Sequence, residues 1–149
     1  MNQILLPLIA FFAGIFLAVQ GSLNAQLGVL LKNPLLATLS AFLSSSLFAL
    51  LFVFIQVRDF PSAKQIYEIP FYLWFTGGLF SVLGISMYYF TIPKLGVATM
   101  ISLGLCGQLI FAVVAGHFGW FNLPEEPISW PRFIGVMAMI LGIILINIK

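Results

Sequence analysis

Neutral polar side chains recur within the long apolar stretches of this chain, and they are its best candidates for binding chemistry. Gln20 and Asn24 are four residues apart, so on a helix they share one face. Ser40 and Ser44 repeat this spacing, and Gln108 adds a third primary amide. A primary amide both donates and accepts hydrogen bonds, so this set suits the binding of a neutral polar solute. The same residue types also join helices to one another within membranes.

The residue types that usually carry catalysis or bind metals are scarce. There is one histidine, His117, and one cysteine, Cys106, so we expect no metal site and no intramolecular disulfide. The four acidic residues all lie outside the apolar stretches, which disfavours a pump that binds cations at an intramembrane carboxylate. No nucleophile, base and orienting group lie at one depth, so an enzyme is the least favoured class. We expect no cofactor, and His117 fits an interfacial residue better than a proton carrier.

The composition indicates whether the chain is surrounded by water or by a lipid membrane. Hydrophobic residues make up 62% of the 149 residues and charged residues 7%, whereas soluble domains are ~25% charged. A soluble domain of this size could not bury so much apolar surface. We therefore predict an all-α integral membrane protein, and we exclude a cytosolic enzyme, a nucleic-acid-binding protein and a disordered chain. The net charge of +2 is too small to indicate an anionic macromolecular partner.

Five uncharged stretches are long enough to cross a bilayer, which takes ~20 residues. They predict a single membrane domain over residues 1–149, with helices over about 4–31, 35–57, 69–92, 95–118 and 132–148. Pro34 and Pro93 mark two of the ends, because proline disfavours helix in the residue before it. The first stretch has no basic residue before it and is longer than a signal-peptide core, so we expect it to remain as a helix.

Depth in the membrane narrows the set of polar candidates. At ~1.5 Å per residue, four of them fall within about 5 Å of the middle of their helices: Gln20, Ser44, Ser81 and Gln108. Transporter sites lie near the midplane. Single serines serve more often as ties between helices, whereas a buried amide needs several partners. We predict a pocket with aromatic walls lined by Gln20, Asn24, Ser44, Trp74 and Gln108, with Ser40, Ser81, Tyr88 and His117 as secondary positions.

The six basic residues divide evenly between the two sides of the membrane. The side of the N-terminus would carry Arg58, Lys64 and Arg132, and the opposite side Lys32, Lys94 and Lys149. An excess of Lys and Arg normally sets the orientation, so this balance predicts dual topology, with copies of both orientations pairing as an antiparallel homodimer. Such a pair supplies the two inverted halves that alternating access usually requires. A short chain with six basic residues can also divide evenly by chance.

Six short motifs follow one another along the chain: residues 20–27, 40–42, 74–78, 92–96, 107–108 and 117–119. In this order they resemble the YdcZ-like family, a domain of unknown function within the drug/metabolite transporter superfamily. The resemblance covers nearly the whole chain. It implies a five-helix transport unit of a bacterial inner membrane, fused in tandem or paired as a homodimer, and it carries Gln20, Asn24 and Gln108 over as pocket residues. The family tends to have an Asp where this chain has Gly116, so we do not expect that carboxylate's role here.

These observations favour a small dual-topology transporter that moves a neutral, amphiphilic or weakly polar solute through a midplane pocket by alternating access. Its partners would be a small-molecule solute, the lipid bilayer and a second copy of the chain, with no nucleic acid. Two alternatives stay open. One is a dual-topology homodimeric channel in which the amides line a continuous pore, and the other is a non-transporting assembly subunit of a membrane complex.

Overall fold

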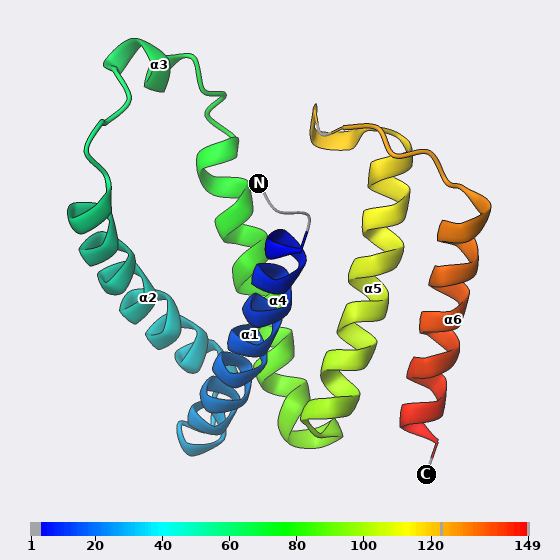
Figure 1. The fold of residues 1–149 in the computed structure, drawn as a ribbon. Coiled ribbons are helices and arrows are strands. Elements are labelled where there is room, and N and C mark those ends of the chain that lie inside the picture. The colour runs from blue at the N-terminus through cyan, green and yellow to red at the C-terminus, as the bar shows by residue number, and fades with distance from the viewer. Residues whose placement is uncertain (1–3, 123, 149) are drawn as a thin grey trace. The chain divides into compact units, whose positions relative to one another are not determined.

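A computed structural model describes residues 4–122 and 124–148 of the chain. Its helices are α1 (Leu5–Leu30), α2 (Pro34–Gln56), α3 (Ala63–Tyr67), α4 (Leu73–Leu95), α5 (Val97–His117), the 3-10 helix η1 (Trp120–Asn122) and α6 (Trp130–Asn147) (Figure 1). Five of them, α1, α2, α4, α5 and α6, are long and apolar enough to cross a membrane. The predicted all-α membrane fold with five spanning helices is thereby confirmed. The chain divides into two compact units, Met1–Lys94 and Leu95–Lys149.

The third membrane helix differs most from its predicted bounds. α4 begins later than predicted, at Leu73, because Pro70 interrupts the backbone hydrogen bonds and the Leu73 N–H donates to the Pro70 carbonyl at 3.0 Å in a tight turn. The helix ends at Leu95, beyond Pro93. Pro93 lacks a backbone N–H donor, but the loss of one hydrogen bond this close to the end of α4 does not interrupt the helix. The helix ends before Gly96, whose φ of +85° is not helical.

Two helices begin at serine caps. Ser62 and Gln65 form a reciprocal capping box that starts α3 within the connection between α2 and α4. The Ser129 hydroxyl accepts a hydrogen bond from the Arg132 backbone N–H at 3.4 Å. This cap lets α6 begin at Trp130, slightly earlier than the sequence predicts.

A close corner joins α1 to α2. The Asn33 side chain caps α2 by accepting a hydrogen bond from the Leu35 N–H at 2.8 Å, and Pro34 occupies the first turn. A Cβ atom placed on Gly28 would lie 3.5 Å from both the Cβ of Ala37 and the Cα of Pro34. The two backbones approach each other closely here because these positions carry small side chains.

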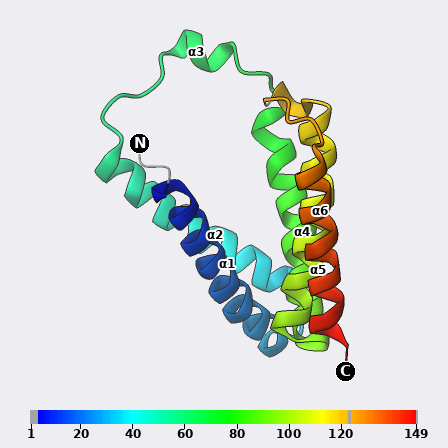
Figure 2. The ribbon, with the colours of Figure 1, turned by 45° about the vertical axis from the view of Figure 1, so that its right-hand side comes forward.

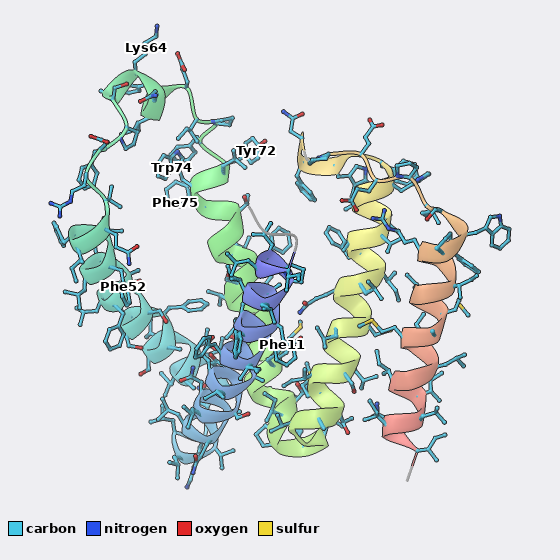
Figure 3. The ribbon with its side chains drawn as sticks, in the orientation of Figure 1. Phe11, Phe52, Lys64, Tyr72, Trp74 and Phe75 are labelled. Carbon is cyan, nitrogen blue, oxygen red and sulfur yellow. The ribbon has the colours of Figure 1, made fainter. Side chains whose placement is uncertain are left out.

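The first unit is packed at one end and splayed at the other. Its buried residues are Ala25 and Gly28 of α1, Ala37, Thr38 and Ala41 of α2, and Tyr89 and Ile92 of α4. All of them lie toward the end where α1 turns into α2. Every residue from 43 to 84 is exposed, and α2 and α4 diverge toward α3 (Figures 1 and 2). Phe52, Trp74 and Phe75 lie on these splayed ends (Figure 3).

In the second unit, hydrogen bonds and an ion pair of a loop residue hold the end of α5 beside the start of α6. The Glu126 backbone N–H donates to the carbonyl oxygen of Gly116 at 2.8 Å. Nη1 of Arg132 donates to the Glu126 carbonyl at 2.9 Å, and Nη2 pairs with Oε2 of Glu126 at 2.6 Å. We call Gly116, Glu126 and Arg132 the loop latch.

Candidate functional site

A buried tyrosine joins the two amides of α1. Nδ2 of Asn24 donates to Oη of Tyr89 at 3.0 Å, and Nε2 of Gln20 donates to the same oxygen at 3.4 Å. Tyr89 is only 2% exposed, and both amides are half-buried. The shared face that the four-residue spacing predicts therefore turns toward α4. We call these three residues the amide–tyrosine cluster.

A pair of hydroxyl groups connects α2 to α4 beside this cluster. Oγ1 of Thr38 and Oγ of Ser86 are 3.0 Å apart. The Thr38 hydroxyl also donates to the carbonyl oxygen of Pro34 at 3.0 Å, so Ser86 is the donor between the two side chains. Because Ser86 lies three residues before Tyr89, both side chains lie on one face of α4. Hydrogen bonds thus join α4 to both α1 and α2.

The amide–tyrosine cluster keeps hydrogen-bonding capacity to spare. Oη of Tyr89 accepts both amide hydrogens, while Oε1 of Gln20 and Oδ1 of Asn24 accept no hydrogen bond from the residues the structure describes. Turning either amide over would exchange donor and acceptor but leave both kinds available. All three groups are neutral. Within residues 4–122 and 124–148, no three His, Cys, Asp or Glu side chains gather where they could hold a metal ion.

The cluster lies inside the membrane span but not at its centre. At 1.5 Å per residue, Gln20 is about 4 Å and Tyr89 about 8 Å from the middle of its helix. Both displacements are toward the end of the unit where α1 turns into α2. Gln20 therefore lies close to the middle of α1, and Tyr89 of α4 lies at a slightly different level.

Two of the predicted pocket residues of the first unit lie apart from the cluster. The Ser44 hydroxyl donates within its own helix, to the carbonyl oxygens of Ser40 at 2.9 Å and Ala41 at 3.0 Å. Trp74 is 55% exposed and lies about 22 Å along α4 from Tyr89, given 1.5 Å per residue. The structure therefore brings Gln20 and Asn24 together, and it leaves Ser44 and Trp74 on exposed helix surface.

The remaining predicted positions lie on different parts of the two units. Ser40 and Ser81 are exposed on α2 and α4, and Tyr88 is half-buried next to Tyr89. Gln108 lies on an exposed surface of α5 in the second unit. Within the first unit, Ser40 and Ser81 are not among the side chains that bond to Tyr89.

His117 lies at the end of α5, next to the loop latch. Its exposed imidazole packs edge-on against Phe118, with ring centroids 4.9 Å apart. A Cβ atom on Gly116 would be 3.7 Å from Cβ of Glu126. The loop therefore brings the Glu126 carboxylate to this helix end, where residue 116 itself carries none, and Arg132 neutralises it.

Three residues that contribute to the site were not predicted from the sequence: Tyr89, Thr38 and Ser86. Tyrosine is common at the boundary of membranes, and the position of Tyr89 near the end of an apolar stretch favoured that role. One signal was present. Ser86 and Tyr89 are three residues apart in an otherwise apolar stretch, and this spacing places both polar groups on one helix face.

One family model matches the chain. It is described as "Putative inner membrane exporter, YdcZ", and the match runs over residues 5–145. It therefore includes α1, α2, α4 and α5 completely and nearly all of α6. The resemblance stated from the six motifs is confirmed. No curated protein and no solved structure matches the chain.

Proposed function

Because this chain belongs to the YdcZ family of inner membrane exporters, we propose that it exports a small neutral solute that binds at the amide–tyrosine cluster. The chain is a multi-pass inner-membrane protein of a transporter family. One observation carries the proposal for the site. Two amide side chains of α1 converge on a single tyrosine oxygen of α4, at 3.0 and 3.4 Å, within membrane-spanning helices.

The chemistry of the cluster supports a neutral solute. Its three side chains offer both hydrogen-bond donors and acceptors but no charge that could compensate an ion. Moving an unpaired ion out of water into such surroundings costs many kcal/mol. A solute with a hydroxyl, carbonyl or amide group avoids this cost. The exposed aromatic side chains of the splayed ends, Phe52, Trp74 and Phe75, favour a solute that also has an apolar part.

The uneven packing of the first unit supports alternating access as the mechanism. α1, α2 and α4 are in contact on one side of the cluster, whereas α2 and α4 diverge on the other. In the proposed cycle, the splayed ends approach one another while the packed ends separate, so that the cluster faces each side of the membrane in turn.

The balance of basic residues supports an antiparallel homodimer as the working form. Three of the six lie on each side of the membrane in the five-helix topology, so positive charge does not favour one orientation. Reporters fused to the C-terminus test this balance. We expect equal signals from a cytoplasmic reporter and an external reporter, whereas a one-sided signal would contradict dual topology.

Transport by matched amide variants tests the proposed site. Vesicles containing the purified protein are loaded with a panel of neutral aromatic alcohols and amides, and their release is measured. Gln20→Leu and Asn24→Leu should each slow release of the transported compound by at least about tenfold, which corresponds to about 1.4 kcal/mol. Gln26→Leu is the control, since Gln26 is exposed on another face of α1. Wild-type rates in both site variants would contradict the proposal.

Gln108 of the second unit stays part of the proposal and has its own variant. Gln108→Ala should abolish solute-dependent release in the same vesicles while the oligomeric state is unchanged. Unchanged release would remove Gln108 from the site without affecting the amide–tyrosine cluster.

A further inference from the structure

One buried polar atom of the second unit lacks a hydrogen-bond partner among the residues the structure describes: Oδ1 of Asn147. Asn147 is the last residue of α6. Its Nδ2 donates to the carbonyl oxygen of Ile143 at 2.7 Å and to Oγ of Ser102 at 3.2 Å. The 2.7 Å contact identifies the nitrogen of the amide, because the opposite orientation would place two acceptors against each other.

The pair of Ser102 and Asn147 has only acceptor capacity left. Both hydrogens of the Asn147 amide are used, and the Ser102 hydroxyl donates to the Thr99 carbonyl at 3.0 Å. The group that completes this pair must therefore be a hydrogen-bond donor. The end of a helix carries partial negative charge, so the end of α6 favours the positive side of a donor dipole. No basic residue occupies the last turn of α6.

The burial of Asn147 argues against a role that consists only of holding α6 against α5. Burying an acceptor without a donor destabilises the closed contact, and a leucine of similar size would avoid that cost. The opposite ends of α5 and α6 are held by the loop latch, where Glu126 bonds to both Gly116 and Arg132. A separation of α6 from α5 at Asn147 would leave this attachment at the start of α6 in place.

We propose that Ser102 and Asn147 form a second binding position for the transported solute, one that accepts a hydrogen bond from its O–H or N–H group when α5 and α6 separate at this end. This inference rests on the proposed function, since it assigns a further contact to the same solute. It also specifies the solute further, because a molecule that carries only acceptors cannot bind here.

The native thiol reports on this position. Cys106 is the chain's only cysteine, and it lies one helical turn from Ser102 on the same face of α5. Alkylation of Cys106 by a water-soluble maleimide is measured in vesicles with benzyl alcohol or with benzyl methyl ether, which lacks the O–H donor. We expect the alcohol to slow alkylation at least threefold more than the ether. In Asn147→Leu, the two compounds should have equal effects.

Two further measurements keep the test decisive. Asn147→Leu should melt no lower than the wild type, because it removes a buried acceptor that has no partner. Leu145→Ala, at a side chain of α6 that is 70% exposed and lies outside this pair, should retain the preference for the alcohol and thus serves as the control. Equal effects of alcohol and ether on the wild type, or a preference that persists in Asn147→Leu, would overturn the inference. Because alkylation requires no transport, an overturned inference leaves the Gln20→Leu and Asn24→Leu result to decide the proposed function separately.

Discussion

The two units place the same kinds of polar side chain in different surroundings. In the first unit, two amides and a tyrosine meet where α1 contacts α4, well inside the span. In the second unit, two polar contacts lie at helix ends: the loop latch at one end, and Ser102 with Asn147 at the other. Water and lipid headgroups can satisfy polar groups near the membrane surface, whereas groups within the hydrocarbon region depend on the protein.

This difference bears on what the contacts are for. A hydrogen bond between membrane helices contributes only about 0.6 kcal/mol on average. The hydrogen bonds of the amide–tyrosine cluster therefore stabilise the fold only slightly, although the cluster fully or partly buries three polar side chains. The loop latch is a surface ion pair, with Arg132 and Glu126 side chains 37% and 58% exposed, and it holds two helix ends together. We therefore expect that some substitutions in the amide–tyrosine cluster reduce transport without a matching loss of stability. Substitutions in the loop latch should lower the stability only slightly.

Removal of the whole Tyr89 side chain should have the largest effect. Tyr89→Ala leaves a cavity between α1 and α4 where the ring is only 2% exposed. We expect the free energy of unfolding to fall by about 3 kcal/mol, as for other buried aromatic residues. Denaturant unfolding in detergent micelles measures this change. Tyr67→Ala is the control, because Tyr67 is 89% exposed, and equal losses in the two variants would contradict the packing described for the first unit.

Disruption of the loop latch should have a smaller effect. Glu126→Gln removes the charge that pairs with Arg132 but keeps the backbone contacts of residue 126. Exposed ion pairs contribute about 0–1 kcal/mol, so the free energy of unfolding should fall by less than about 1 kcal/mol, and the loss should shrink further in high salt. A loss as large as that of Tyr89→Ala would mean that the second unit depends on its latch as the first depends on Tyr89.

The five membrane helices could be predicted from the sequence because an uncharged stretch of sufficient length has few alternatives in a bilayer. Their ends were harder to predict. Pro93 predicted the end of the helix through its effect on the preceding residue, but α4 continues past it to Leu95. Pro70, which the sequence-based prediction did not use, decides where α4 begins.

The candidate site could be predicted only in part. The spacing of Gln20 and Asn24 placed them on one face, but their partner Tyr89 is 65 residues away from Asn24 along the chain. Helix spacing carries no information about which faces of two distant helices meet. Ser44 shows the complementary difficulty. A serine in a helix can bond to its own backbone or to a neighbouring helix, and here it bonds to its own.

The Tyr89 hydroxyl offers the most direct test that the amide–tyrosine cluster binds the transported solute. Tyr89→Phe keeps the ring that packs between α1 and α4 and removes only the oxygen that accepts hydrogen bonds from Gln20 and Asn24. We predict that release of the transported compound from vesicles falls at least about tenfold, while the free energy of unfolding changes by less than about 1 kcal/mol. A folded Tyr89→Phe variant that transports at the wild-type rate would contradict this account.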